Sequence, residues 1–219
     1  MLKFVKNINI MYSNKLILLI WSICICHIAS AQSRYAENLR TFVGNEWISV
    51  PHEIILKPLD KKNPTEFQVK CDSKPTRKQL KNFALFLQHN DSLYINAATA
   101  CNIPINNGFF TKAYHINDST ILFTEFIEKV PKFYAGVGST MIPIGVNPFT
   151  NPYKLQNRFC FIINTKNKYT VAEIVTPEMA EELLAPFPGL LAEYKNKPEK
   201  QRVYADVLIE LFSRAGLLK

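Results

Sequence analysis

Alternating apolar and polar positions run through the middle of the chain and predict β-strands there. Apolar side chains recur at every second position in residues 67–71 and again in residues 83–97, where the turn His89-Asn90-Asp91 interrupts them. A period of two is that of a strand with one buried face, and a turn between two such runs predicts a hairpin. Residues 78–88 also have apolar positions at helical spacing, but we favour a strand because the turn and the return strand fit it.

The same alternation predicts two further hairpins. They pair residues 109–116 with residues 119–127, and residues 157–163 with residues 169–175. Closer to the N-terminus, apolar spacings of three and four predict a short helix over residues 33–43 that Gly44 ends. Residues 47–56 are rich in Trp, Ile and Val but contain Pro51, so they predict an edge strand or two short strands.

The C-terminal part changes from the strand period to the helical one. Thr176-Pro177-Glu178 combines a hydroxyl cap, a proline at the first helical position and an early acid, which together predict a helix start. A second helix is expected after the break at residues 187–189, and a third from Pro198 to Gly216. The chain therefore predicts an α+β fold, in which antiparallel β-hairpins form a sheet or a partly open barrel and C-terminal helices pack on it.

The N-terminus has the three parts of a secretory signal peptide in the right order. Three lysines and no acid open it, residues 16–26 form an apolar core, and Ala29-Ser30-Ala31 supplies the small residues that a signal peptidase needs. This apolar core is too short to cross a bilayer, which takes about 20 residues. A lipoprotein signal is another alternative, but Cys24 and Cys26 each follow a bulky isoleucine. We expect cleavage after Ala31 and an exported protein that is periplasmic, outer-membrane-associated or extracellular.

The exported part, residues 32–219, is expected to be one α+β domain, mainly β in residues 32–175 and helical in residues 176–219. The full chain has 26 basic and 18 acidic residues, and three of the lysines lie in the leader, so the domain keeps a net charge of about +5. Its densest basic stretch is residues 70–81, where a solvated face beside a turn is favoured over an anion site. Nucleic-acid-binding modules concentrate basic residues on one face or element, so we expect no nucleic-acid partner.

Cysteine usage gives no framework for the fold. Cys71, Cys101 and Cys160 remain after cleavage, and their spacing matches no disulfide pattern, although secretion permits a bridge. A domain of this length buries a sufficient core without cross-links. We expect no essential disulfide, and we expect Cys71 and Cys160 to act as small buried apolar residues in strands.

The sequence predicts no catalytic residue, no metal site and no cofactor. His52, His89 and His115 lie far apart and have no cysteine or acid at metal-ligand spacing. Neither a nucleophile elbow nor a His-Glu-x-x-His motif is present. Glu125 and Glu128 are the nearest candidates for the carboxylate pair of a glycosidase, but on a strand they point to opposite faces.

Residues 134–146 carry no charge and hold three of the seven glycines of the chain. Three interpretations remain open: a buried loop with a strand, the wall of a ligand cavity where glycine allows close approach, or an apolar surface for self-association or lipid. The candidate contact residues of this segment are Gly136, Gly138, Met141, Ile142 and Gly145.

Two serines, Ser92 and Ser119, follow aspartates in predicted turns. Asp91-Ser92-Leu93 and Asp118-Ser119-Thr120 resemble the acceptor motif for O-linked glycosylation in Bacteroides-type bacteria. The alternative, that Asp and Ser simply form the turns, is favoured because both are common turn residues.

Several short phrases of the sequence are similar to those of a known group. They are NDSLYIN at residues 90–96, RFCFIIN at residues 158–164, TPE at residues 176–178 and FPGLL at residues 187–191, with Leu183, Leu184 and Tyr194. These phrases resemble an uncharacterised family of secreted proteins of unknown function from Bacteroides-type bacteria. Members also have an apolar insert at residues 134–146, richer in glycine than the present one. The resemblance covers about residues 67–217; it supports export and implies no activity.

The leading hypothesis is an exported, non-catalytic binding or interaction module. Its partner would be a small apolar ligand inside the sheet, or a glycan or envelope protein at the surface, and the mature chain would have no transmembrane segment. One alternative is an envelope hydrolase whose polar residues converge only in three dimensions, at a cleft where a histidine meets a carboxylate or a hydroxyl. Another is a structural envelope component that self-associates through residues 134–146.

Overall fold

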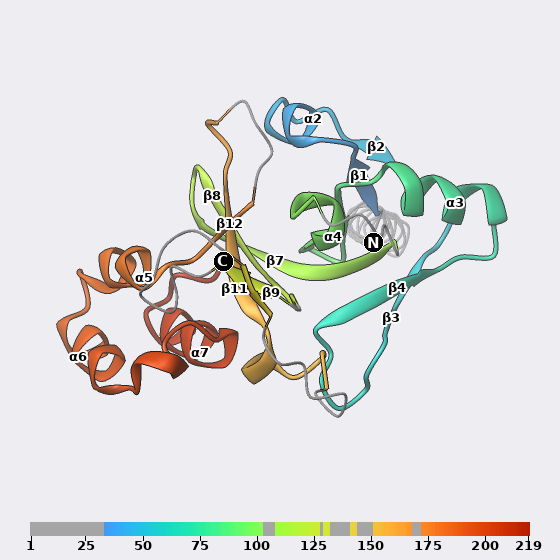
Figure 1. The fold of residues 1–219 in the computed structure, drawn as a ribbon. Helices are drawn as coiled ribbons and strands as arrows, with labels where there is room; N and C mark the ends of the chain where they lie inside the picture. Colours follow the sequence, from blue (N-terminus) through green and yellow to red (C-terminus); the bar gives the residue numbers. More distant parts are fainter. Residues whose placement is uncertain (1–32, 103–107, 128, 132–140, 144–150, 168–171) are drawn as a thin grey trace, which may run out of the picture.

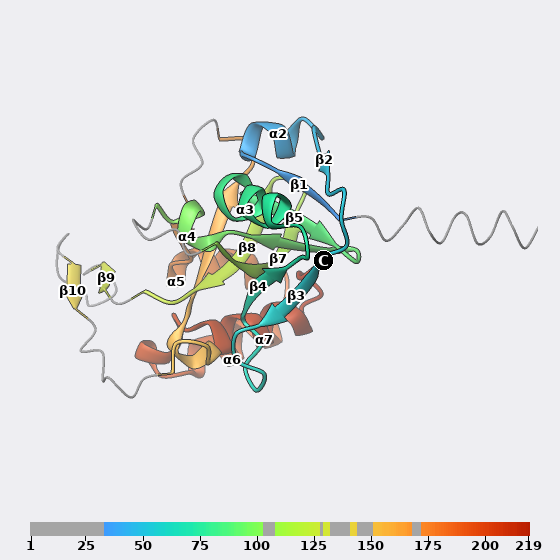
Figure 2. The same cartoon turned by 90° about the vertical axis from the view of Figure 1, so that its right-hand side faces the viewer.

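The computed structural model describes residues 33–102, 108–127, 129–131, 141–143, 151–167 and 172–219. The predicted leader lies outside the described residues. The described chain is built on one large antiparallel sheet with helices on both of its faces (Figures 1 and 2). The α+β prediction is thereby confirmed, with an open sheet in place of a barrel.

The sheet has ten strands, of which eight follow the order β12-β11-β8-β7-β6-β5-β1-β2, while β4 pairs with β7 and β3 pairs with β4. The strands are β1 (Arg34–Ala36), β2 (Ile48–Ser49), β3 (Ile55–Pro58), β4 (Glu66–Lys70), β5 (Phe86–His89), β6 (Ser92–Ile95), β7 (Phe109–Asn117), β8 (Thr120–Glu125), β11 (Phe159–Asn164) and β12 (Glu173–Ile174). A separate two-stranded sheet joins β9 (Lys129–Pro131) to β10 (Met141–Pro143). The predicted hairpins β5–β6 and β7–β8, and the pairing of β11 with β12, are confirmed.

Strand β7 is paired with two different strands along one of its edges. Thr111 pairs with β6 and with Glu66 of β4, while Ala113 pairs with β6 and with Phe123 of β8. Because a strand has only two edges, β4 and β8 must share the edge that β6 does not occupy. Beyond Phe123, β8 is paired with β11 alone, and β4 takes its place beside β7. We call this branching point the β4/β8 fork, and it positions the candidate site.

Strands β8 and β11 are buried on both faces, which explains their almost continuous apolar sequences. The face that carries Ile121 and Phe123 packs with α2 (Leu39–Val43) and α4 (Ala97–Ala100). The opposite face carries Leu122 and Cys160 and packs with the three C-terminal helices. These are α5 (Pro177–Leu184), α6 (Pro188–Asn196) and α7 (Ala205–Arg214).

The predicted C-terminal helices are present, and the first begins where expected. Thr176 Oγ1 accepts a hydrogen bond from the backbone N–H of Met179 at 3.3 Å, as an N-cap should. The third helix begins later than predicted, because only the 3-10 turn Glu199–Gln201 follows Pro198. Tyr204 forms a β-bridge with Phe159 and has an extended backbone, so α7 starts only at the next residue.

The strand favoured for residues 78–88 is wrong over its first part. Helix α3 spans Lys74–Phe83, and β5 begins only at Phe86. Ser73 caps the helix by accepting from the backbone N–H of Thr76 at 3.4 Å, and Pro75 stands in its first turn. Thr76 and Leu80 are buried at helical spacing. The local start signals therefore outweigh the two-residue period.

The helix predicted over residues 33–43 is also partly wrong. Residues Arg34–Ala36 form β1, which pairs with both β5 and β2, and only Leu39–Val43 is helical. A capping box at Asn38 starts this short helix, and Gly44 ends it as predicted. Residues 47–56 contribute two short strands, β2 and the start of β3, which confirms that alternative.

The three cysteines of the described chain are free thiols. Cys160 lies fully buried on β11, and Cys71 is buried one residue beyond the end of β4. Both therefore serve as apolar core residues. Among the described residues, none of the helices is both long enough and apolar enough to cross a bilayer.

Candidate functional site

The β4/β8 fork brings two acidic side chains together. Glu125 is the last residue of β8 and Glu66 is the first residue of β4. Both strands run antiparallel to β7 along the same edge, so the end of one meets the beginning of the other. Two carboxyl groups at one largely buried point require a compensating cation.

Arg158 supplies that cation, and it is fully buried. Its Nη1 lies 2.9 Å from Glu66 Oε1 and 3.1 Å from the carbonyl oxygen of Pro152. Its Nη2 donates to the carbonyl oxygen of Thr124 at 2.9 Å and lies 3.7 Å from Glu125 Oε1, and its Nε donates to Thr124 Oγ1 at 3.3 Å. A guanidinium has five N–H donors, and four hydrogen bonds use four of them, while Glu125 adds an ion pair at 3.7 Å. The side chain thus joins β4, β8 and the segment that precedes β11.

Glu125 is the titratable member of this cluster. Burial raises the pKa of Glu125 to about 7 against the lowering effect of Arg158, and the nearby carboxyl of Glu66 adds to the rise. The backbone N–H of Phe126 donates to Glu125 Oε1 at 2.8 Å and holds the side chain in place. Near neutral pH the cluster therefore exchanges one proton with solvent.

We expect the folded protein to gain stability as the pH falls from 8 to 5, because Glu125 binds its proton more tightly when folded than when unfolded. The contribution is fully present below the ordinary carboxyl pKa of 4.5 and is lost as the pH rises through about 7. It amounts to about 3 kcal/mol. Urea denaturation of wild type and E125Q across this range measures it as the difference between the two curves. A constant difference would contradict the assignment.

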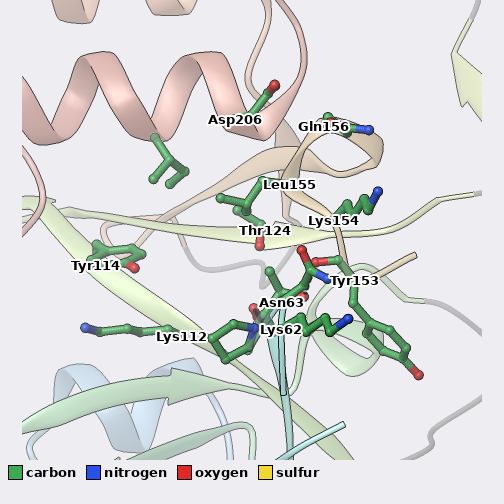
Figure 3. Close-up of a pocket in the computed structure, with 14 residues that line it drawn as sticks. Lys62, Asn63, Lys112, Tyr114, Thr124, Tyr153, Lys154, Leu155, Gln156 and Asp206 are labelled. Atoms are coloured by element: carbon green, nitrogen blue, oxygen red, sulfur yellow. Dashed lines mark hydrogen bonds between the residues drawn. The ribbon is translucent and has the colours of Figure 1, made fainter. Parts of the chain in front are cut away.

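A groove of about 480 Å³ opens beside the fork. Figure 3 shows Thr124 near its middle, Asp206 of α7 on one side, and Lys62 and Asn63 from the loop between β3 and β4 on the other. Thr65 and Thr111 also line it. Because Thr124 contacts both the groove and Arg158, the buried cluster supports the groove wall directly.

The groove has a mostly apolar surface, and its charged groups include more cations than acids. Its cations are Lys62, Lys112 and Lys154, and its acid is Asp206. Lys112 Nζ lies 5.3 Å from the centre of the Tyr114 ring, within the range of a cation–π contact. Burial raises the pKa of Tyr114, so its hydroxyl remains a hydrogen-bond donor at neutral pH. The groove therefore offers ammonium groups and hydroxyls to a ligand.

Hydrogen bonds hold the rim of the groove in place. Thr65 Oγ1 donates to the carbonyl oxygen of Tyr153 at 2.9 Å and joins the two rim loops. Asp60 accepts from the side chains of Asn63 at 2.9 Å and Asn151 at 3.2 Å. These amide donors, together with the backbone N–H of Lys62, lower the pKa of Asp60 to about 2. The loops are therefore tied to each other without a ligand.

Two of the three histidines line a different cavity, of about 700 Å³, and each contacts a hydroxyl. His89 Nδ1 lies 2.8 Å from Ser33 Oγ, and His52 Nδ1 lies 2.8 Å from Thr76 Oγ1. Asn90 Nδ2 donates to His89 Nε2 at 3.1 Å, so the ring proton of a neutral His89 is on Nδ1 and points at Ser33. Burial lowers the pKa of His89 and favours this neutral form. A general base for Ser33 would need the opposite arrangement.

The other residues singled out from the sequence are not brought together in the described chain. His115 is exposed on β7. Met141 and Ile142 lie in β10, while Gly136, Gly138, Gly145 and Glu128 lie outside the described residues. Ser92 begins β6, and Ser119 lies in the turn between β7 and β8. Among the described residues, no cluster of three or more His, Cys, Asp or Glu side chains could hold a metal ion.

Cys101 and Cys160 offer no reactive thiolate. Burial raises the pKa of Cys101, which lies close to Glu125, and the charge of Glu125 raises it further. Burial likewise raises the pKa of Cys160. A thiol is nucleophilic only as the thiolate, so both groups are chemically quiet at neutral pH.

Sequence reasoning missed Arg158 and Glu66, the residues that build this site. The available signal was Arg158, a cation directly before the apolar run at residues 159–163. It was missed because a charge at the end of a strand usually faces solvent. Its partner Glu66 is 92 residues away in the chain.

Comparison with known proteins assigns a family but no activity. The family model described as "Family of unknown function (DUF6563)" matches residues 35–219. No curated protein and no solved structure matches the chain. The groove and the buried cluster both lie within the matched region.

Proposed function

Because the chain belongs to the family of unknown function DUF6563, we propose a function from its groove: an exported, non-catalytic binding protein whose ligand is an acidic glycan. The observation that carries the proposal is the groove at the β4/β8 fork, which is lined by three lysines, one acid and several hydroxyls. Membership of the family leaves this ligand open.

The size and lining of the groove favour a short oligosaccharide segment. Small-molecule sites typically enclose about 300–1,000 Å³, and the groove of about 480 Å³ falls within that range. The mostly apolar surface of the groove is typical of such sites. Thr65, Thr111, Thr124 and the Tyr114 hydroxyl add polar groups that suit the hydroxyls of a sugar ring.

The charges favour a ligand with carboxylate or sulfate groups. Lys62 and Lys154 come from opposite rim loops, and Lys112 belongs to β7, with its ammonium near the Tyr114 ring. None of the ion pairs found in the described chain involves these three lysines. Their ammonium groups therefore remain available for charge-assisted hydrogen bonds, which are stronger than neutral ones.

Export follows from the leader pattern of residues 1–31 and remains part of the proposal. A glycan ligand suits a protein that works outside the cytoplasm. The hydrolase alternative is less well supported, because His89 donates to Ser33 instead of accepting from it. Self-association through residues 134–146 would be compatible with glycan binding and concerns a segment that lies largely outside the described residues.

Isothermal titration calorimetry with trigalacturonate tests the proposal. The protein is expressed with its leader in place and recovered after export. We expect saturable binding of trigalacturonate and at least about tenfold weaker binding of maltotriose, a neutral trisaccharide, because one lost charge-assisted hydrogen bond is worth about 1.4 kcal/mol or more. Equal affinity for the two sugars, or no binding of the acidic one, would reject an acidic glycan as the ligand.

A further inference from the structure

Helix α3 presents a basic face to solvent. Lys74, Arg77, Lys78 and Lys81 stand at positions i, i+3, i+4 and i+7 of this ten-residue helix, and all four are exposed. Residues at this spacing share one side of a helix. Leu80 anchors the opposite side in the core and is 1% exposed.

This face holds most of the excess charge of the exported protein. Helix α3 has four cations and no acid, so its net charge is +4. Residues 32–219 together have a net charge of about +5. None of the ion pairs in the described part of the chain involves α3. The remaining charges of residues 32–219 are nearly balanced in number.

The surroundings of α3 suit a flat partner better than a small ligand. The helix lies on the side of the molecule away from α5–α7 (Figures 1 and 2), and it contributes no residue to the two cavities described above. The stem of Lys81 lies against the backbone of Gly108, where an added Cβ would collide with it. The C-terminal end of the basic face is therefore held in place by Lys81.

We propose that α3 docks the protein on an anionic lipid bilayer. An anionic membrane surface complements an exposed row of cations, and each Lys or Arg held near such a surface strengthens binding on the order of fivefold. Attraction of this kind weakens at high salt because the Debye length shortens. Since α3 contributes no residue to the groove, docking leaves the proposed glycan site free.

Flotation with lipid vesicles tests this proposal on the exported protein. We expect binding to vesicles that mix phosphatidylglycerol with phosphatidylcholine, little binding to pure phosphatidylcholine, and loss of binding at high salt. The variant K74Q/R77Q/K78Q/K81Q should bind the anionic vesicles at least about tenfold more weakly. The control variant R40Q/K57Q/K166Q/K200Q removes the same charge from exposed positions outside α3 and should bind like wild type.

Three outcomes would overturn the proposal. They are equal binding of wild type to neutral and anionic vesicles, equal losses in the two quadruple variants, and binding of a heparin oligosaccharide through α3 without binding to vesicles. Circular dichroism of both variants checks that they fold. Titration of the α3 variant with trigalacturonate separates the two sites, because groove binding should persist when vesicle binding is lost.

Discussion

Replacing Arg158 with methionine should lower the free energy of unfolding by about 3–5 kcal/mol, the usual result of breaking a buried ion pair from one side. The substitution leaves Glu66 and Glu125 without their cation, and it leaves the carbonyl oxygens of Thr124 and Pro152 without their donor. Urea denaturation followed by circular dichroism measures the loss. An effect below about 1 kcal/mol would show that the cluster does not hold the fork together.

Matched variants separate the buried cluster from ordinary surface charge. Arg214 also contacts two glutamates, but its side chain is 48% exposed, so R214M should cost less than about 1 kcal/mol. R158K keeps the charge but loses the forked geometry and should fall between wild type and R158M. Adding E66Q and E125Q to R158M should recover part of the loss, because no buried carboxylate is then left unpaired.

Removing the three groove cations should lower the affinity for trigalacturonate about a hundredfold. In K62Q/K112Q/K154Q each substitution replaces a charge-assisted hydrogen bond with a neutral one, and a total loss of about 3 kcal/mol corresponds to that factor. All three side chains are exposed, so stability should change by less than about 0.5 kcal/mol. Calorimetric titration measures the affinity.

The control for this experiment removes the same number of charges elsewhere. Lys57, Lys166 and Lys200 are exposed and lie outside the groove, so K57Q/K166Q/K200Q should bind trigalacturonate like wild type. Equal weakening of the two triple variants would mean that overall charge, and not the groove, attracts the sugar.

Local signals predicted the parts of the fold that depend on neighbouring residues. Thr176 caps α5 through a residue three positions away, and the turn at Asn90-Asp91 joins two adjacent strands with both residues at positive φ. The strand predicted for residues 78–88 was wrong over its first part, because the apolar positions there fit both the strand period and the helix period. The decisive signals were Ser73 and Pro75, which precede that stretch and start α3.

Such local signals do not predict the candidate site, because it is built from distant parts of the chain. Thr111 is opposite Glu66 only because β4 replaces β8 along β7, and no local pattern encodes that exchange. Thr65 meets Tyr153 across 88 residues of sequence. The sequence did predict strands at residues 67–71, 109–116 and 119–127, next to these contacts. The pairing of the strands depends on packing, because β8 and β11 must be covered on both faces.

A crystal structure of the exported protein with trigalacturonate tests the central claim most directly. The account predicts the sugar in the groove at the β4/β8 fork, with at least one carboxylate within hydrogen-bonding distance of Nζ of Lys62, Lys112 or Lys154, and with Arg158 still bound to Glu66. A trisaccharide bound at another surface, or a groove left empty at saturating sugar, would contradict it.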